Sequence, residues 1–487
     1  MNGKHGLEDD SNEETKKPRV EASDGIVVES SNRHYLETIN KELLNFDYEK
    51  VCSVSLSNVN VYCCLVCGKY FQGRSRTSHA YLHAVNMDHH VFINMETLKC
   101  YILPENKELT GRAKVFDEIR SLINPQYTME DIALLQVSDD FNYNTKDIPP
   151  LQVSYDLHHK VYHPGYVGLN NISCNTYANV ILQLLSHIPP IRDYFLSLST
   201  TLKQDERELL DSKSELNAKF GLLVRKIWSK NLYRNHISPH ELMQLVKSKF
   251  SLGSQPNPKH FLVWLLNQLH MTLAKALGTK QTVFSKSFQG KIRIKATPVN
   301  KQTETTTTIR KFWMITLDLS DSSPFQKTLE SNDENPINDH ITQVSFKSLL
   351  SKYDGETITQ ATESELNTFQ IVGPAPPYLI FHIDRKEDIK SNSKAPKVLK
   401  FESPMDMSPY VLGGNTSPHV YDLVGHVKHE SIPGVELDRS DDKHDWTVSV
   451  RRNRNDWVSI HDLDIEPCNG DLLFLEESYL LVWRKRD

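Results

Sequence analysis

The chain of 487 residues has room for two or more domains, and its 38% hydrophobic and 24% charged residues are typical of a globular protein. Its formal net charge of -6 at pH 7 describes a nearly balanced surface, which excludes a general attraction of the whole molecule to nucleic acid or to a membrane. The sequence contains no apolar run long enough to cross a bilayer, and residues 1–29 are too polar for a signal peptide, so we expect a soluble intracellular protein.

The N-terminal tail, residues 1–32, is charged and rich in Ser, Glu and Asp, and its first thirty residues contain no aromatic side chain. Such a segment cannot bury enough apolar surface to offset its ordering entropy, so we expect it to be disordered. The run KKPR at residues 16–19 is open to two readings, a nuclear-import signal or a solvated cluster of charges.

Two segments follow the tail. Residues 33–109 mix aromatic, Cys and His residues and predict one compact module. Residues 110–154 predict a helical stretch that is interrupted at Pro125, because a proline inside a helix removes a hydrogen bond and clashes with the preceding turn. The same segment ends in a polar connector with two consecutive prolines, which predicts a domain boundary.

The remainder, residues 155–487, begins with helical periodicity and ends in short strand-like runs. We expect helices over residues 175–188, 215–230, 239–250 and 257–277. Strands are expected over residues 291–297, 311–319, 377–383, 446–450 and 472–485, and the threonine-rich run 303–308 is expected to be a loop or a strand edge. Helices first and strands later predict an α+β domain.

The cysteines indicate a metal site in a reducing compartment rather than a disulfide framework, because their number is odd and four of the seven lie within residues 52–67. Cys64 and Cys67 form a Cys-x-x-Cys turn that can present two thiolates to one tetrahedral metal. Cys63 is a poor ligand, because neighbouring residues of an extended chain point to opposite faces. Histidines that could complete the metal site follow at His79, His83, His89 and His90. The alternative is a buried cluster of free thiols with histidines on the surface.

The run CCLVCGKYFQGRSRTSHAYLHAVNMDHH resembles the UBP-type zinc finger of ubiquitin-specific peptidases. The resemblance implies one structural zinc ion, held by Cys64, Cys67, His83 and His89. A further zinc site of many relatives needs a Cys where this chain has Gln72, which leaves Cys52 and His79 without a metal. The resemblance also places Tyr62 and Arg74 near the positions that grip the ubiquitin C-terminus, but Tyr replaces the usual Trp, which argues against ubiquitin binding.

The run GLNNISCNTYAN resembles the cysteine box of the same peptidases, GLxNxGNTCYMN, and the two align without a gap. The alignment places Thr176 at the nucleophile position and Cys174 two residues too early. A threonine hydroxyl is far less acidic than a thiol and needs a well-placed base to attack a carbonyl. Cys174 is a poor substitute, because two positions rotate a side chain by roughly 200° if the helical turn already begins there.

Three later runs extend the resemblance over the whole domain: PAPPYLIFHIDR, YDLVGHVKH and ESYLLVWRKR. In the histidine box, the runs HDWTVSV and WVSIHD match GHYxAYV and WYxFDD of the family. The match places Asp445 at the catalytic base and His461 at the usual Asn or Asp. His444 lies one residue away, and a shift of one along a strand turns a side chain to the opposite face. His429 and His461 are expected to be ordinary surface or loop histidines.

The oxyanion-type amide, Asn171, matches the family, and without an activated nucleophile we expect it to form structural hydrogen bonds. The predicted fold is therefore α+β, a small UBP-type zinc finger followed by a papain-like ubiquitin-specific-peptidase domain without catalytic residues. This combination resembles the inactive, spliceosomal members of the ubiquitin-specific peptidases. The resemblance implies a nuclear, non-catalytic scaffold of the tri-snRNP that is required for pre-mRNA splicing and contacts tri-snRNP proteins.

Two basic runs, RRNRN at residues 451–455 and WRKRD at residues 483–487, offer side chains for snRNA phosphates or remain solvated loops. Two other functions stay open. One is an active deubiquitinase, a cysteine isopeptidase that uses a displaced Cys174 and His444. The other is an adaptor that reads ubiquitin through residues 33–109.

Overall fold

The structure is a computed structural model of the chain, and it describes residues 33–109, 114–138, 152–172, 174–201, 212–250, 257–299, 305–319, 343–362, 365–385, 398–413, 418–430, 445–453 and 456–486. The expected disordered tail with its KKPR run, His444 and most of the polar connector lie outside these residues. Among the described helices, none is both long and apolar enough to traverse a lipid bilayer.

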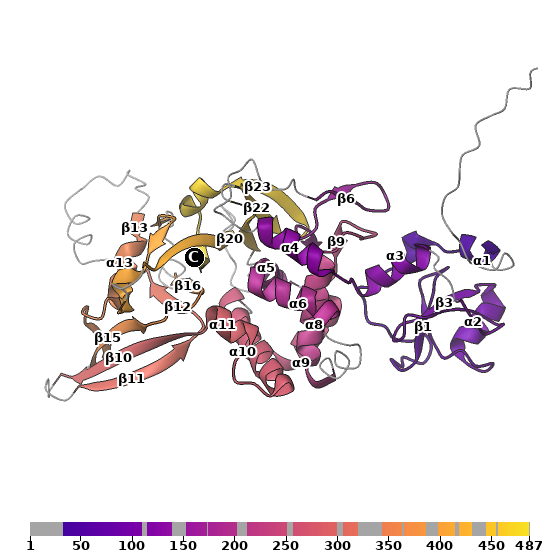
Figure 1. Cartoon of the computed structure of the whole chain (residues 1–487), viewed down its shortest axis with the longest axis horizontal. Helices are drawn as coiled ribbons and strands as arrows, with labels where there is room; N and C mark the ends of the chain where they lie inside the picture. Colours follow the sequence, from indigo (N-terminus) through magenta and orange to yellow (C-terminus); the bar gives the residue numbers. More distant parts are fainter. Residues whose placement is uncertain are drawn as a thin grey trace, which may run out of the picture.

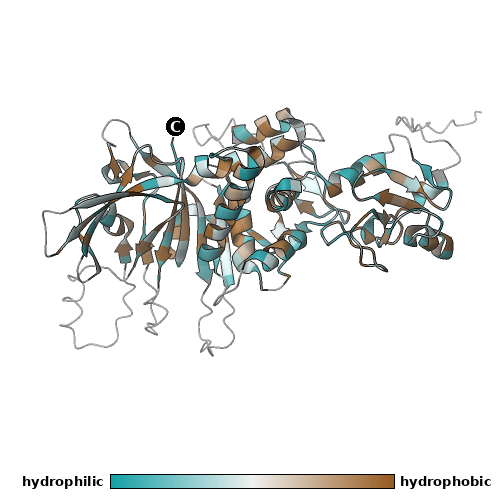
Figure 2. Cartoon of the chain, turned by 90° about the horizontal axis from the view of Figure 1, so that it is seen from below, coloured by the Kyte–Doolittle hydropathy of each residue, from teal (hydrophilic) through white to brown (hydrophobic). Residues whose placement is uncertain are grey.

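The molecule is elongated, with a small sheet module at one end, helices in the middle and larger sheets at the other end (Figure 1). Figure 2 shows hydrophobic residues on the helices and on the strands of both sheet regions, interleaved with hydrophilic ones. The order of helices before strands agrees with the expected α+β domain.

The end module is a five-stranded sheet in the order β2-β1-β3-β4-β5. Its interior strand β1 is buried on both faces, because Val61 and Cys63 face one apolar cluster while Tyr62 and Cys64 face another. The strands are β1 (Val61–Cys64), β2 (Tyr70–Gln72), β3 (Val91–Asn94), β4 (Cys100–Ile102) and β5 (Lys107–Glu108).

Three helices pack against this sheet or connect it to the rest of the molecule. Helix α2 (His79–Met87) contributes Ala80 and Ala84 to the cluster that contains Cys64. Helix α3 (Lys114–Ile123) packs its apolar side on the other cluster, with Val61 and Cys63. Helix α4 (Met129–Ser138) instead buries Ile132 among the central helices. The expected helical segment therefore divides its contacts between the two parts of the molecule, and the break lies at Pro125, between α3 and α4.

The central helices surround α5 (Thr176–Ser186), every residue of which is buried. Gly425 lets α5 approach the large sheet, because a Cβ atom there would lie 2.3 Å from the Leu184 side chain. The longest helix, α10 (Pro258–Leu277), begins at Asn257, whose side chain accepts from the His260 N–H, and ends at Gly278 in the left-handed conformation. The remaining helices are α6 (Pro189–Thr201), α8 (Glu215–Ile227), α9 (His240–Lys249) and α11 (Val283–Phe288).

The large sheet has the order β12-β16-β24-β20-β21-β22-β23 and is covered on both faces. Along β16, Tyr378 and Ile380 face the helices while Leu379 and Phe381 face a second core, which explains the nearly continuous apolar run in the sequence. The strands are β12 (Ile315–Asp318), β16 (Tyr378–Asp384), β24 (Ser478–Lys485), β20 (Val420–Glu430), β21 (Asp445–Arg451), β22 (Asp456–His461) and β23 (Asp464–Asn469).

A second sheet projects from this core in the order β11-β10-β15-β14. Its strands are β11 (Thr306–Phe312), β10 (Gly290–Pro298), β15 (Glu365–Val372) and β14 (Thr359–Thr362). Two expected strands need correction here. The run 311–319 is not one strand, because it ends β11, turns at Trp313 and enters the large sheet as β12. Residues 472–475 form part of a 3-10 helix, and the last strand begins only at Ser478.

Charged side chains fix the end module against the central helices. Lys226 of α8 is buried and donates to the Asp47 carboxylate at 2.7 Å and to the Phe46 carbonyl at 3.0 Å. Glu241 of α9 accepts from both Lys50 and Lys219. A buried charge is tolerated only when it is paired, so these contacts tie the two parts together across a sequence separation of nearly 200 residues.

Candidate functional site

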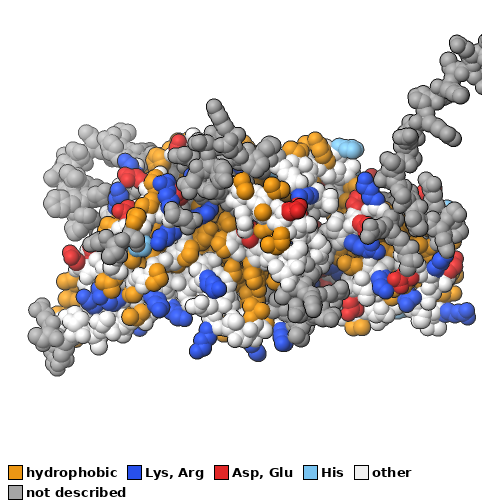
Figure 3. All heavy atoms as spheres, in the orientation of Figure 1, with side chains coloured by type: hydrophobic (Ala, Val, Ile, Leu, Met, Phe, Trp, Pro, Cys, Tyr) orange, Lys and Arg blue, Asp and Glu red, His pale blue; other side chains and the backbone are white. Residues whose placement is uncertain are grey.

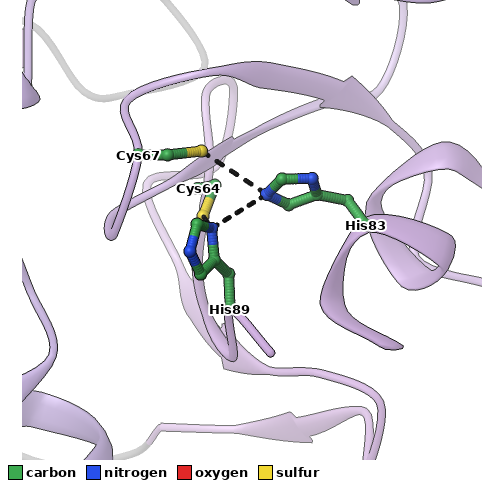
Figure 4. Close-up of side chains that lie close together, drawn as sticks. All are labelled: Cys64, Cys67, His83 and His89. Carbon is green, nitrogen blue, oxygen red and sulfur yellow. Dashed lines mark hydrogen bonds between the residues drawn. The ribbon is translucent and has the colours of Figure 1, made fainter. Parts of the chain in front are cut away.

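The four predicted metal ligands come together from three elements of the end module (Figure 4). Cys64 ends β1 and Cys67 lies in the turn that follows. The turn closes through the Gly68 N–H, which donates to the Cys64 carbonyl at 2.9 Å. Gly68 has φ +72°, and a Cβ atom there would lie 2.2 Å from the Leu43 carbonyl oxygen, so the turn requires glycine.

The two histidines reach the thiols from α2 and from the residues after it. His83 lies in α2, and His89 follows the left-handed Asp88 that ends the helix. The Cys67 Sγ to His83 Nε2 distance is 3.4 Å, the Cys64 Sγ to His89 Nδ1 distance is 3.7 Å, and the two rings approach to 3.1 Å. Ligand atoms around a tetrahedral zinc ion lie about 3.3–3.8 Å apart, as bond lengths of about 2.0–2.3 Å require. Two of the three distances fall in this range, and all four donor atoms lie within 4.8 Å of one another, so small side-chain adjustments would complete a tetrahedral zinc shell.

The protonation of these groups also suits a metal. The hydrogen bond between the two thiols raises the pKa of Cys64 and lowers the pKa of Cys67 to about 4. Burial lowers the pKa of His83, so its ring is neutral at neutral pH. Zinc binds thiolates and neutral imidazoles; Cys67 and His83 are already in these states, and Cys64 would lose its proton when the metal binds.

Other candidates for the same site point elsewhere. Cys63 is buried in the cluster on the opposite face of β1, as the strand alternation predicts. His90 contacts the Asp88 carboxylate and the Leu103 carbonyl, both at 2.7 Å. His79 is the first residue of α2, and the set of four donors that lie within 4.8 Å of one another does not include it.

The loop that contains Cys52 has the same shape as the metal turn but is held by hydrogen bonds. The Leu56 N–H donates to the Cys52 carbonyl at 3.0 Å, and Leu56 has φ +56°, the counterpart of Gly68. Ser55 takes the place of the second cysteine, and its hydroxyl donates to the Gln72 amide oxygen at 2.9 Å. The Gln72 amide in turn donates to the Ser57 hydroxyl at 3.1 Å.

The two residues predicted near a ubiquitin-tail pocket, Tyr62 and Arg74, both contact Tyr101. The Arg74 guanidinium lies 4.4 Å from the centre of the Tyr101 ring and also donates to the Asn106 side chain. Tyr62 is buried, and its ring meets Tyr101 edge to face at 5.9 Å. The Arg74 donors therefore have partners within the module itself.

At the second predicted site, Thr176 is the first residue of α5 and is buried. Its hydroxyl accepts from the Asn171 amide at 2.9 Å and donates to the Asp462 carboxylate at 3.3 Å. Neither partner, among the described residues, is an imidazole. Cys174 is exposed, has φ +52° and forms no hydrogen bond with the described residues, so it points away from this arrangement.

Asp462 connects the segment before α5 to the end of β22. Its carboxylate accepts from the Asn171 amide at 2.9 Å and from the Asn179 amide at 2.7 Å, and its carbonyl accepts from the Leu169 N–H at 2.8 Å. Gly168 permits this approach, because a Cβ atom there would lie 2.8 Å from the Leu463 Cα. The sequence interpretation missed Asp462, although it occupies the second Asp of WYxFDD.

Asp445, predicted at the position of the catalytic histidine, and His461, predicted at the position of the usual Asn or Asp, form a pair in the structure. Asp445 begins β21, His461 ends β22, and the His461 Nε2 to Asp445 Oδ1 distance is 2.6 Å. The imidazole and the carboxylate have exchanged places relative to the family pattern. His461 keeps about a third of its side chain exposed, as expected for a histidine near the surface, but its hydrogen bond to Asp445 was not predicted. His429 is also partly buried, and its ring lies 4.9 Å from Trp446.

Comparisons with known proteins identify both parts of the chain. Residues 167–483 match the family model for ubiquitin carboxyl-terminal hydrolase, and residues 52–114 match the model for the Zn-finger in ubiquitin-hydrolases and other proteins. The chain is 36% identical to the probable mRNA-splicing protein ubp10 of Schizosaccharomyces pombe, over 93% of this chain and 89% of the relative. It is 30% identical to the pre-mRNA-splicing factor SAD1 of Saccharomyces cerevisiae, over 96% and 97%.

Among solved structures, an essential yeast splicing factor superposes with a TM-score of 0.70 at 28% identity, covering 93% of this chain and 100% of that one. The likeness extends over the zinc-finger module and the larger domain together. The zinc-finger match and the Cys64, Cys67, His83 and His89 cluster indicate zinc as the metal.

Proposed function

This chain belongs to the ubiquitin carboxyl-terminal hydrolase family, and from that premise we propose that it is a non-catalytic protein of pre-mRNA splicing that acts through its folded surfaces. Two relatives that align with it over more than nine tenths of its length carry splicing in their names, and the solved structure that superposes over 93% of it is a splicing factor. Full-length similarity at these identities supports a shared role.

One observation carries the absence of catalysis: the hydroxyl at the nucleophile position is hydrogen-bonded to a carboxylate and to an amide. The peptidases of this family activate their nucleophile with an imidazole base, and the described residues place no imidazole against the Thr176 hydroxyl. An imidazole beside the hydroxyl would supply that base, but His461 pairs with Asp445 instead. Thr176 and its neighbours Asn171, Asn179 and Asp462 stand where the family has its catalytic cleft, and we call these four the cleft residues. They connect α5 to the large sheet rather than attack a substrate.

In the end module, Cys64, Cys67, His83 and His89 hold one structural zinc ion. When bound, the ion cross-links β1, its turn and α2, and it has no catalytic task because four protein ligands fill a tetrahedral shell. The binding energy then stabilises the fold of residues 33–109. Arg74, Tyr62 and Tyr101 engage one another, which supports a module whose role is structural rather than one that reads ubiquitin.

The partners that this function implies are proteins of a spliceosomal particle, the tri-snRNP, with snRNA phosphates as a second kind of contact, and the location is the nucleus. The names of the relatives support spliceosomal partners in general. The close attachment of the end module to the central helices through Lys226 and Glu241 supports a rigid scaffold that presents both parts together.

Depletion and rescue of splicing in an extract tests the proposal. Removing the protein from a nuclear extract should stop splicing of a reporter pre-mRNA, and adding back the purified chain should restore it. The matched variants are Cys174→Ser and Thr176→Ala, and both should restore splicing to the wild-type level. The purified chain should also form no covalent adduct with ubiquitin that carries a thiol-reactive group at its C-terminus. Failure of Cys174→Ser to restore splicing, together with an adduct at Cys174, would establish the alternative cysteine isopeptidase.

A further inference from the structure

The hairpin formed by β10 and β11 carries a row of basic side chains on one face. The register pairs Lys291 with Lys311, Arg293 with Ile309 and Lys295 with Thr307. Directly paired residues of antiparallel strands project to the same side, and residues two apart along a strand do so as well. Four cations therefore share one face, which we call the basic hairpin face: Lys291, Arg293, Lys295 and Lys311.

The opposite face of the same sheet packs on the protein. Ile292, Phe312 and Phe369 contact the second core, and the Phe369 ring lies 6.0 Å from Tyr353. The basic hairpin face is consequently directed away from that core. Figure 3 shows Lys and Arg side chains lying over this hairpin at the lower left of the molecule.

The charges of the basic hairpin face lack acidic partners. Lys291, Lys295 and Lys311 form no ion pair or hydrogen bond with the described residues, and Arg293 donates to the neutral Gln370 amide. The positions of β10, β11 and β15 that share this face contain no carboxylate. On the neighbouring helix α10, burial and then the charge of Lys311 lower the pKa of His270. The register places one described carboxylate at the edge of this face, that of Asp354, which pairs with Gln370 and accepts from the Glu356 and Thr357 N–H groups. The four cations of the face outnumber it, so the face keeps a net positive charge.

The two basic runs that the sequence analysis singles out behave differently. Asp422 accepts from Arg486 through both carboxylate oxygens and lies 3.7 Å from Arg451. Arg452 pairs with Asp456 at 3.1 Å. These contacts offset the charge of the C-terminal runs. Within these runs Lys485 is a described cation without an ion pair to the described residues, whereas the hairpin groups four cations on one face. A polyanion would thus find the larger cluster of uncompensated cations on the hairpin.

The composition of the face favours nucleic acid over a protein partner. The centres of protein interfaces are enriched in aromatic residues and depleted in lysine, whereas surfaces that bind nucleic acid are strongly basic and polar. The basic hairpin face has three lysines and one arginine beside threonines, and Ile309 is its exposed apolar residue. The described positions of the face contain no aromatic ring on which a base could stack, so contacts would be to phosphates.

We propose that the basic hairpin face, Lys291, Arg293, Lys295 and Lys311, binds the sugar-phosphate backbone of RNA without reading its bases. The inference rests on the proposed function, because a protein of an RNA-containing particle meets such a backbone. It adds a defined surface to that function. Contacts of this kind depend on salt, and each phosphate neutralised contributes about 0.7–0.9 to the slope of log K against log salt.

The test compares two triple variants of the full chain that change net charge equally. Lys291→Gln/Lys295→Gln/Lys311→Gln removes the lysines of the face, and Lys213→Gln/Lys247→Gln/Lys249→Gln removes three exposed lysines elsewhere. Binding to a labelled 20-base-pair RNA duplex is measured by fluorescence anisotropy over a range of salt concentrations. The hairpin variant should bind at least about tenfold more weakly and lose about 2–3 from the salt slope, while the control should match the wild type. Thermal unfolding should be the same for all three proteins.

Three outcomes would overturn the inference: no binding of the wild type to RNA, an equal loss in both variants, or equally tight binding of a polyglutamate peptide to the hairpin, which would assign the face to an acidic protein. A strong preference between two duplexes of different sequence would contradict the absence of base contacts. The splicing assay separates this result from the proposed function, because a chain that restores splicing while failing to bind RNA refutes the inference alone.

Discussion

The zinc centre and the cleft around Thr176 both join residues that are distant in the chain, but they depend on different interactions. In the finger, two thiols and two imidazoles are directed at one point that only a metal ion can satisfy fully. In the cleft, a threonine hydroxyl, asparagine amides and the Asp462 carboxylate satisfy one another directly. The comparison predicts that the finger requires its ion to fold, whereas the hydrogen bonds around Thr176 are satisfied by the protein itself.

The largest effect is expected where the metal is lost. Cys64→Ser should abolish zinc binding and unfold residues 33–109, because binding of a structural zinc ion contributes about 10–16 kcal/mol in small finger domains. Elemental analysis and limited proteolysis of the full chain would show the loss. Cys52→Ser is the matched control, since Cys52 is a buried thiol of the same module outside the cluster. Retention of one zinc ion by Cys64→Ser would contradict the assignment.

A smaller effect is expected in the cleft. Asp462→Ala should lower the free energy of unfolding by about 1–3 kcal/mol, because the buried Asn179 amide loses its best acceptor. Asp462→Asn keeps one acceptor oxygen and should cost less. Urea unfolding of the two variants would measure both values. If Asp462→Ala were as stable as the wild type, the cleft network would not connect α5 to the sheet.

The Cys-x-x-Cys spacing and strand alternation predicted Cys64 and Cys67 as metal ligands, while the resemblance to the UBP-type finger selected His83 and His89 among four candidate histidines. The sequence patterns also placed helices α5, α8, α9 and α10 and the buried strands β16 and β21, but they did not predict α6, α11 or β20. Asp462 escaped prediction because its partners Asn171 and Asn179 lie more than 280 residues earlier. No local periodicity reports a contact over that separation.

Other differences between the predicted and the observed structure arise where one stretch of sequence contributes to two elements. The run 311–319 reads as one strand, and only the turn at Trp313 divides it between two sheets. The Trp313 indole donates to Asn267 of α10, a tertiary contact that the strand pattern does not contain. The pairing of His461 with Asp445 was equally hidden, because both residues are single polar positions at strand ends.

A third prediction asks whether a thiol alone restores chemistry to the cleft. In a Cys174→Ser background, Thr176→Cys should be alkylated by iodoacetamide at pH 7.5 at least about tenfold more slowly than Cys174 in the wild type, because burial and the adjacent Asp462 carboxylate both disfavour the thiolate. Mass spectrometry over time would give the rates. A faster rate for the introduced thiol would show an activating group in the cleft and would weaken the proposed loss of catalysis.

The last prediction concerns the pH dependence of stability that arises from a histidine kept neutral by burial rather than by a metal ion. His426 of β20 is fully buried, and its Nε2 lies 2.9 Å from the Ser478 hydroxyl. Burial, with smaller contributions from Lys428 and Arg385, lowers its pKa to about 3. An unfolded chain protonates this ring near pH 6.5, so between pH 6.5 and 3 the unfolded state binds the additional proton.

Stability contributed by a neutral His426 is therefore present above pH 6.5 and falls by about 1.4 kcal/mol for each pH unit below it. His426→Gln cannot titrate, so its free energy of unfolding should decline less steeply between pH 6.5 and 5.5, while the exposed control His158→Gln should follow the wild type. Urea unfolding of zinc-loaded protein at each pH gives the slopes. Identical slopes for His426→Gln and the wild type would mean that this ring is already protonated in the folded sheet, and burial could then not be what keeps it neutral.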